Sequence, residues 1–291
     1  MSESPHLTTP SHVSRLLAEY GLRTDRRHGQ HFLADRNILL ASITASGLQP
    51  DEGVLEIGAG IGTLTVELAG HAAQVLTFEI DHRLLPVLHA QIDGSPSVRL
   101  VEQDFLRADL AVLLPDTFGS RPWRVVANIP YNITAPILQR LFTDTAGWRC
   151  AVLMVQREVA ERLTAEPGSD IAGAITIFAH YHIRPELIRR VPASVFYPPP
   201  RVESALIRLT PIPPALPAAD EARMFRIVHA VFQQRRKTLS NALTQLFGAD
   251  RTRIDQCITA AGIDPSLRGE RLTLSQFMEL AQHTADFNTS L

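Results

Sequence analysis

The alternation of apolar and polar residues predicts strands and helices in turn over the first two thirds of the chain. Short, almost wholly apolar runs predict buried strands, and apolar residues that recur every three or four positions predict helices. The expected strands are residues 54–57, 74–80, 98–102, 124–127 and 150–155. The expected helices are residues 11–27, 35–46 (with Asp35 as N-cap), 63–69, 83–91, 135–142 and 158–165. Strands that alternate with helices indicate a mostly parallel sheet that is covered on both faces.

The pattern changes in the last third of the chain. Residues 174–178, 187–191 and 204–209 predict further strands with no full helix between them, so we expect an antiparallel edge of the sheet. The proline-rich stretch 211–217 predicts a linker, because proline continues neither a helix nor a sheet. Beyond it the period is helical only, over residues 224–232, 238–247, 254–261 and 274–281. We expect an N-terminal arm or helix at 1–27, an α/β domain at 28–212 and a small all-helical domain at 213–291.

Composition narrows the class of protein. The 291 residues are 45% hydrophobic and include two cysteines, which favours a reducing compartment over a disulfide scaffold. The longest apolar runs fall short of the ~18 residues that a membrane span needs, and the first residues lack the pattern of a secretory signal. We therefore expect a cytoplasmic protein without membrane contact. We also expect a monomer, because no strong self-association feature is visible.

Charge adds one candidate surface. The formal net charge of -2 argues against a protein that coats nucleic acid indiscriminately. Residues 222–249 nevertheless contain five basic residues and no acidic one, and three of the five are consecutive: Arg235, Arg236 and Lys237. By itself this run favours a solvated helix face, with phosphate contact in structured RNA as the alternative.

A glycine-rich segment follows the first strand of the expected parallel sheet. Residues 56–62 contain Gly58 and Gly60, which let the backbone approach a ligand at the start of the next helix. Glu79 follows Gly58 by 21 positions, at the end of the next strand, where a carboxylate can accept hydrogen bonds from ribose hydroxyls. Asp104, beside Phe105, could accept from an adenine amino group or serve as a turn residue. The glycine spacing differs from that of dinucleotide sites, which favours S-adenosylmethionine.

A short motif at the end of the fourth strand suggests the chemistry. It reads Asn128-Ile129-Pro130-Tyr131. The exocyclic amino group of a base is a poor nucleophile because its lone pair is delocalised into the ring. The Asn128 amide oxygen and the Ile129 carbonyl could accept its two N–H bonds and aim the lone pair at a methyl group, with Pro130 stiffening the segment. Tyr131 could stack on a flipped base. The alternative is a turn after a strand with a buried tyrosine.

These motifs together resemble those of the ribosomal RNA adenine dimethyltransferases of the KsgA/RsmA type, to which Erm and Dim-type enzymes are related. The resemblance covers about His28 to Ala242. Its strings are Gly29-Gln30-His31-Phe32-Leu33, Glu56-Ile57-Gly58-Ala59-Gly60, Phe78-Glu79-Ile80-Asp81, Gln103-Asp104-Phe105, Asn128-Ile129-Pro130-Tyr131-Asn132-Ile133, Gln156-Arg157-Glu158-Val159-Ala160, Val195-Phe196-Tyr197-Pro198-Pro199-Pro200-Arg201-Val202-Glu203-Ser204 and Arg235-Arg236-Lys237-Thr238-Leu239.

The resemblance implies a class I, Rossmann-like methyltransferase fold and assigns the site residues. The S-adenosylmethionine contacts fall on His31, Leu33, Gly58, Gly60, Glu79, Asp104 and Asn128. His31 stands where the family usually has asparagine, so a contact through that side chain is a departure from the pattern. Tyr131 and Phe196 match the two aromatic residues that sandwich the target adenine, and Arg235, Arg236 and Lys237 match an RNA-contacting string.

The implied function is S-adenosylmethionine-dependent dimethylation of N6 on two adjacent adenosines, in a hairpin near the 3′ end of 16S ribosomal RNA in the small subunit. The product would be S-adenosylhomocysteine, and a role in small-subunit biogenesis would follow. Two alternatives stay open: an Erm-like methylase of 23S ribosomal RNA, and a ribosome-assembly checkpoint that acts mainly by binding. No metal is expected, because the pair His180 and His182 lacks a third ligand at sensible spacing.

Overall fold

The computed structural model describes residues 9–22, 30–143, 145 and 147–287, and within them the chain forms two compact units. The sheet unit comprises Met1–Ala160 and Glu186–Pro211, and the helical unit comprises Glu161–Pro185 and Ile212–Leu291. The helical unit thus takes residues 161–185 in addition to the expected C-terminal stretch. Residues 23–27 of the expected first helix, and His28 and Gly29 of the motif that follows, lie outside the described residues.

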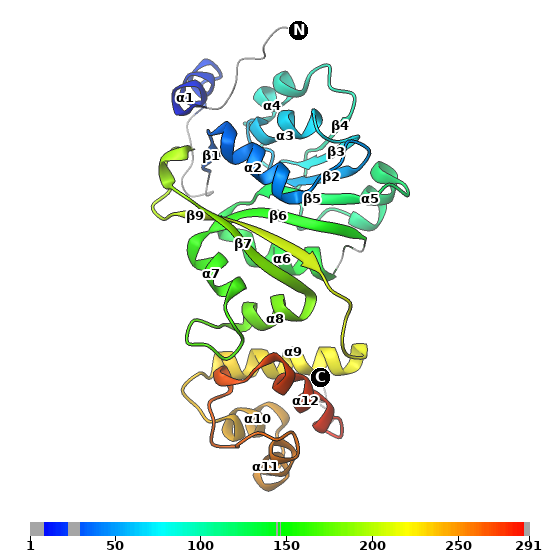
Figure 1. Ribbon diagram of the computed structural model, residues 1–291, viewed down its shortest axis with the longest axis vertical. Helices are drawn as coiled ribbons and strands as arrows, with labels where there is room; N and C mark the ends of the chain where they lie inside the picture. Colours follow the sequence, from blue (N-terminus) through cyan, green and yellow to red (C-terminus); the bar gives the residue numbers. More distant parts are fainter. Residues whose placement is uncertain (1–8, 23–29, 144, 146, 288–291) are drawn as a thin grey trace. The chain divides into compact units, whose positions relative to one another are not determined.

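Seven strands form one sheet in the order β4-β3-β2-β5-β6-β9-β7 (Figure 1). Their bounds are β2 (Gly53–Ile57), β3 (Gln74–Phe78), β4 (Val98–Val101), β5 (Trp123–Asn128), β6 (Trp148–Gln156), β7 (Ile183–Val191) and β9 (Ser204–Pro211). Strands β2 to β6 run parallel, and β9 pairs antiparallel with β6. The expected mostly parallel sheet with an antiparallel addition is therefore confirmed. A second, two-stranded sheet pairs β1 (Phe32–Leu33) antiparallel with β8 (Phe196–Tyr197).

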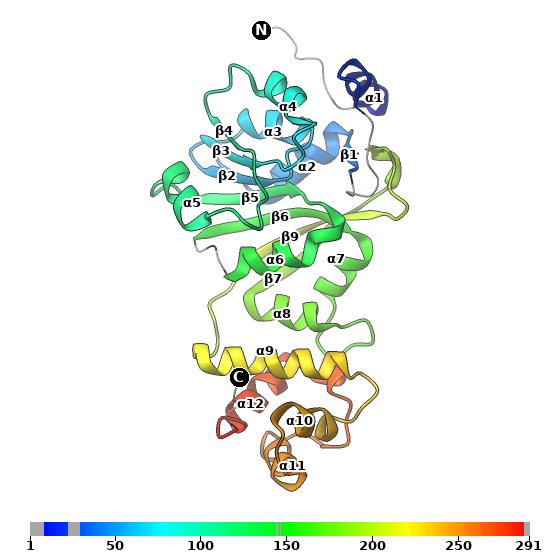
Figure 2. The same ribbon diagram turned by 180° about the vertical axis from the view of Figure 1, so that it is seen from behind.

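Helices cover both faces of the seven-stranded sheet. Helices α2 and α3 lie against the face that Figure 1 shows, and α6 lies in front of the opposite face in Figure 2. Because side chains alternate along a strand, Val54, Val126 and Val152 all point to the α2 and α3 side. The helices of this unit are α1 (Pro10–Glu19), α2 (Arg36–Ser46), α3 (Thr63–Ala69), α4 (Leu85–Ile92), α5 (Leu110–Phe118) and α6 (Thr134–Thr143), and α7 (Arg157–Thr164) continues from it into the helical unit.

Local sequence explains the start of α2. The side chain of Asp35 accepts hydrogen bonds from the backbone N–H groups of Asn37 at 2.8 Å and Ile38 at 3.2 Å. These are two of the N–H groups that have no partner within the helix, so the predicted N-cap is confirmed. The cap fixes where α2 begins, directly after the segment Gln30–Ala34 that reaches the candidate site.

Several elements differ from the sequence prediction. The first helix, expected over residues 11–27, ends at Glu19, and the short strands β1 and β8 were not predicted. Residues 174–178, expected as a strand, begin helix α8 (Ala174–His182) instead. The run Ile-Thr-Ile-Phe looks like a strand, but Thr176 accepts from the Gly173 N–H at 2.9 Å, and Ile177 and Tyr181, four residues apart, share one buried helix face. Helix α5 was not predicted, because Pro115 inside it is a helix-breaking signal.

The helical unit is built around its own apolar core. Helices α8, α9 (Ala218–Gln233), α10 (Leu239–Phe247), α11 (Arg251–Ala260) and α12 (Leu274–His283) all contribute to it. Among its fully buried side chains are Ile227, Leu243, Ile254 and Phe277. Residues 212–217 belong to neither a helix nor a strand, as expected of the linker predicted over 211–217, whereas Pro211 is the last residue of β9. No helix among the described residues has the length and apolar character of a membrane span.

Candidate active site

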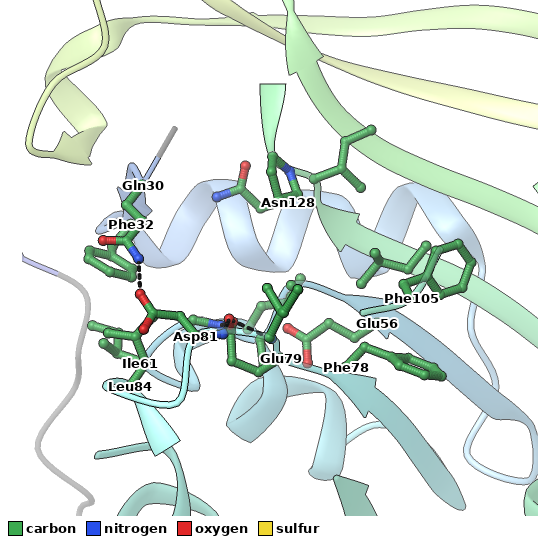
Figure 3. Close-up of a pocket in the computed structure, with 18 of the residues that line it drawn as sticks. Gln30, Phe32, Glu56, Ile61, Phe78, Glu79, Asp81, Leu84, Phe105 and Asn128 are labelled. Atoms are coloured by element: carbon green, nitrogen blue, oxygen red, sulfur yellow. Dashed lines mark hydrogen bonds between the residues drawn. The ribbon is translucent and has the colours of Figure 1, made fainter. Parts of the chain in front are cut away.

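A cavity of about 630 Å³ opens at the carboxyl ends of β2, β3, β4 and β5, within the sheet unit. This is the point where the strand order reverses, since the chain passes from β2 outward to β4 and then returns to β5 on the other side of β2. The lining includes all expected cofactor residues and the whole Asn-Ile-Pro-Tyr motif: His31, Leu33, Gly58, Gly60, Glu79, Asp104, Asn128, Ile129, Pro130 and Tyr131. Figure 3 shows Asn128 on one side of the cavity and Glu56 and Glu79 on the other.

The glycine-rich loop needs its glycines for conformation and for space. Gly58 and Gly60 have φ of 82° and 61°, in the left-handed region that side chains disfavour. A Cβ on Gly60 would lie 3.2 Å from the ring of Phe32, and one on Gly58 would lie 3.5 Å from Cδ of Pro130. The loop after β2 therefore packs directly against both the β1 segment and the loop after β5.

Glu79 follows β3 directly and is only 7% exposed. Its carboxylate accepts from the backbone N–H groups of Gly60 at 2.7 Å, Ile80 at 2.9 Å and Asp81 at 2.8 Å. Burial raises the pKa of Glu79 above its usual range, and these N–H groups act in the opposite direction. A carboxylate has about four acceptor positions, so one remains for a ligand hydroxyl.

Asp104 serves as a turn residue and also lines the cavity. Its Oδ1 accepts from the Leu106 N–H at 2.9 Å, as a turn residue does, while Oδ2 lies 3.9 Å from Nε of Arg107. The residue lines the cavity beside Phe105. Arg140 of α6 donates to the carbonyls of Phe105 and Ala108 and places its guanidinium 5.5 Å from the Phe105 ring centroid, which fixes this loop.

Asn128 ends β5 with a defined amide orientation. Its Nδ2 donates to the backbone carbonyl of His31 at 3.2 Å. This bond uses one hydrogen of the amide NH2 and sets its orientation, and Oδ1 is the end that can accept a hydrogen bond from a ligand. The arrangement supplies the acceptor that activation of an amino group requires.

The two expected aromatic residues occupy different environments. Tyr131 lines the cavity, its hydroxyl bonds to Oγ of Ser204, and burial raises its pKa to about 12, so the hydroxyl stays protonated. Phe196 in β8 is 1% exposed, packs among core residues such as Ile38 and Val191, and is not among the residues that line the cavity. The ring that faces Tyr131 is instead that of His31, with centroids 6.0 Å apart and an interplanar angle of 27°.

Comparison with known proteins places this site in a family. Residues 21–286 match the sequence model of the family described as Ribosomal RNA adenine dimethylase. The chain belongs to this family. It is 41% identical to the Ribosomal RNA small subunit methyltransferase A of Lactiplantibacillus plantarum, over 98% of this chain and 99% of that protein.

Solved structures agree with the family assignment. The 23S rRNA methyltransferase ErmE is 28% identical, with a TM-score of 0.66 over 87% of this chain and 98% of that one. A dimethyladenosine transferase from Plasmodium falciparum is 25% identical, with a TM-score of 0.69 over 87% of this chain and 97% of that one. The class I methyltransferase fold expected from the resemblance is confirmed.

As a member of the ribosomal RNA adenine dimethylase family, the chain uses S-adenosylmethionine, and the cavity fits this cofactor. Its volume lies in the range of ~300–1,000 Å³ that is common for small-molecule sites. Glu79 and Asp104 place carboxylate oxygens on its wall, which are acceptors of the kind that ribose hydroxyls and an adenine amino group need. The hydroxyl of Thr63, a cavity-lining residue, is buried without a hydrogen-bond partner in the described part of the chain. That residue is one more polar group on the wall of the site.

Two features of this site were not assigned from the sequence. Glu56 lies inside the quoted glycine-rich string, yet its role was not predicted: the carboxyl is buried, accepts from Oγ1 of Thr65 and of Thr77 at 2.7 Å each, and faces the cavity. Nε2 of Gln30 donates to Oδ2 of Asp81 at 2.6 Å and so joins the segment before β1 to the loop after β3 (Figure 3). The second contact has no local sequence signal, because 51 residues separate its partners.

The expected RNA-contacting run lies in the helical unit. Arg235, Arg236 and Lys237 are all exposed in the turn between α9 and α10. Arg235 pairs with Glu270, and Nζ of Lys237 donates to Oε1 of Gln245 at 3.4 Å. Among the described residues no cluster of three or more His, Cys, Asp or Glu side chains could hold a metal ion.

Proposed function

We propose that this protein transfers methyl groups from S-adenosylmethionine to N6 of two adjacent adenosines, in a hairpin near the 3′ end of 16S ribosomal RNA within the small subunit. The observation that carries the proposal is the orientation of Asn128, whose Nδ2 is bonded to His31 and whose Oδ1 is left to accept from an amino group. The similarity to small-subunit methyltransferases over nearly the full chain supports the choice of RNA.

The chain's own residues would activate the base. Asn128 Oδ1 and the Ile129 carbonyl each accept one N–H of the adenine amino group, which draws its lone pair out of conjugation. Pro130 holds the backbone of this segment, and the ring of Tyr131 supports the face of the flipped base.

The bound cofactor supplies a methyl group on a sulfonium, and the N6 lone pair forms the new C–N bond as the C–S bond breaks. The alkylated amine loses its proton readily to water, so no strong general base is required of the chain. Catalysis rests on positioning and on hydrogen-bond acceptors that are already in place. A second round on the same nitrogen gives the dimethyl product.

The helical unit would supply the RNA contact through Arg235, Arg236 and Lys237. Lysine and arginine at a surface turn release counterions when they meet phosphates, which adds affinity without base recognition. We propose that the protein acts as a monomer on the small subunit or its precursor, in the cytoplasm where such subunits are assembled, with a role in their biogenesis.

Two other functions are weaker candidates. The similarity to ErmE, at 28% identity over 87% of the chain, supports an Erm-like action on 23S ribosomal RNA. The small-subunit relative is 41% identical over 98% of the chain, which favours the first function. A checkpoint role that depends on binding alone would leave the oriented amide of Asn128 without a purpose.

Mass spectrometry of RNA after incubation with the purified protein and S-adenosylmethionine tests the proposal. The substrates are unmethylated small subunits and, in parallel, naked 23S RNA. We expect N6,N6-dimethyladenosine at two adjacent 16S positions. Dimethylation of a single 23S adenosine would instead support the Erm-like function. If neither RNA is modified, the substrate assignment is refuted.

A further inference from the structure

His31 touches the candidate site in three ways, and its side chain accounts for two of them. Its backbone carbonyl accepts from Nδ2 of Asn128 at 3.2 Å. Its ring stacks against Tyr131 at 6.0 Å between centroids. Its Nδ1 lies 2.7 Å from the carbonyl oxygen of Pro198, which follows β8. One residue thus contacts both ends of the Asn-Ile-Pro-Tyr motif and the segment after β8.

The contact with Pro198 fixes the state and the orientation of the imidazole. A carbonyl oxygen can only accept, so Nδ1 must carry the hydrogen in this bond. The ring is then held at one corner and cannot turn over without breaking that bond. Its flat face stays against Tyr131 as a consequence.

Tyr131 is held from two directions. Its hydroxyl bonds to Ser204, the first residue of β9, and its ring packs against His31. A phenol ring held at its hydroxyl can still rotate about its Cβ–Cγ bond, because the hydroxyl oxygen lies on that axis, and a neighbouring ring face restricts that rotation. Phe196 cannot serve in its place, because it is buried in the core beside β1.

We propose that His31 is a positioning residue that orients Tyr131, through its ring, and Asn128, through its anchored backbone, for the methylation of adenine N6. This inference rests on the proposed function. It makes the imidazole ring important for the rate of methyl transfer, beyond the cofactor contact that the resemblance assigns to His31.

Three substitutions distinguish the effect of the His31 ring from the effect of its hydrogen bond to the Pro198 carbonyl. His31→Asn keeps a side-chain donor for the Pro198 carbonyl and removes the ring. His31→Phe keeps a ring beside Tyr131 and removes the donor. His31→Ala removes both. The full-length variants are compared with the unmodified protein on unmethylated small subunits, with kcat, KM for subunits and the Kd of S-adenosylmethionine measured for each.

We expect kcat to fall about tenfold in His31→Asn and somewhat more in His31→Ala, because small misplacements of reacting groups are costly. His31→Phe should lose less than His31→Asn. The Kd of S-adenosylmethionine should change by a smaller factor than kcat in all three variants, because a positioning residue acts mainly on the chemical step. A loosened pocket should also release more N6-monomethyladenosine relative to the dimethyl product, a readout that a smaller folded fraction would not change.

Two results would overturn the inference: an unchanged kcat and product ratio in His31→Asn, or a weakened cofactor Kd with unchanged kcat in all variants. The second would make His31 a cofactor contact alone, with no part in positioning Tyr131 or Asn128. If the unmodified protein forms no dimethyladenosine on either RNA, the proposed function itself fails, and this inference falls with it.

Discussion

The sheet unit and the helical unit differ in where their charged side chains lie. In the sheet unit, carboxylates such as Glu56 and Glu79 are buried at strand ends and face one cavity. In the helical unit, charged groups lie at the surface and pair with each other, as Arg235 does with Glu270 and Arg271 with Asp170 at 2.5 Å. Burial of charge is costly and needs a purpose, whereas surface pairs contribute little to stability. The contrast supports the proposal that the chemistry takes place in the sheet unit and that the helical unit contacts RNA.

Removal of the Asn128 amide should have the largest effect. Asn128→Ala deletes the acceptor for the amino group, and loss of one preorganised hydrogen-bond partner in other enzymes costs ~10²–10³ in rate. We expect a fall of that order in kcat on small subunits, with subunit binding unchanged. Asn37→Ala, an exposed asparagine on α2, is the matched control.

The assembly phenotype of the same variant addresses the binding-only alternative. Asn128→Ala should fail to restore subunit assembly in cells that lack the activity, provided that it still binds subunits. Full restoration would show that binding is enough for the biological role. It would contradict the proposal that methyl transfer in the sheet unit is required.

Stability should respond to pH through the sheet unit. Burial raises the pKa of Glu56 from 4.5 to about 7, against the opposing hydrogen bonds from Thr65 and Thr77. The folded state therefore keeps this proton longer than the unfolded chain, and this carboxyl lowers stability progressively as pH rises from 4.5 to about 7. The effect is absent below this range and complete above it.

Glu56→Gln should remove this pH dependence, because one amide oxygen can still accept from both threonines. At pH 8 the variant should be more stable by up to about 3 kcal/mol, and below pH 4 the two proteins should match. Tryptophan fluorescence during urea unfolding measures the stability of the sheet unit, because both tryptophans, Trp123 and Trp148, lie in it. Parallel stability curves at all pH values would contradict the assignment.

Cofactor recognition should depend on the charge of Asp104. Asp104→Asn can keep the turn bond to Leu106 through its amide oxygen, but it can place an amide donor where an adenine amino group needs an acceptor. Loss of a hydrogen bond to a charged group predicts a rise of roughly 10-fold in the Kd of S-adenosylmethionine. Calorimetric titration measures it, with Asp116→Asn on α5 as control. An unchanged Kd would restrict Asp104 to its turn role.

The smallest effect is expected from the surface of the helical unit. The double substitution Arg236→Ala with Lys237→Ala should weaken subunit binding several-fold and lower the slope of log affinity against log salt by about 2. Arg251→Ala, which removes an exposed arginine of α11 paired with Asp255, should leave the slope unchanged. Equal slopes for the double variant and the unmodified protein would remove this run from the RNA surface.

Most of the fold and the cavity could be predicted from the sequence because their signals are local. The apolar runs and glycine spacing marked β2, the glycine-rich loop and α3, and the residues at strand ends converge because parallel strands end at one edge. Helix α8 was predicted wrongly, because its strand-like composition was overridden by a local cap and by burial of Ile177 and Tyr181 on one face.

The contacts that could not be predicted join residues far apart in sequence. The position of Phe196 before three prolines favoured a ring at the cavity, but pairing of β8 with β1 turns it into the core. The bond from His31 to Pro198 spans 167 residues, and only the folded arrangement of β1 and β8 brings them together. The resemblance placed His31 at the cofactor site, but its contacts with Pro198 and Tyr131 are visible only in the structure.

The most direct test of the division between the units is the single-turnover rate of methyl transfer inside a preformed complex. Saturating protein, either unmodified or with Arg236→Ala and Lys237→Ala, is bound to unmethylated small subunits before S-adenosylmethionine is added. We predict the same rate of N6 methylation for both proteins once binding is complete, since the helical unit supplies only affinity. A rate that remains many-fold lower in the fully bound double variant would contradict the account, because the helical surface would then take part in the chemical step.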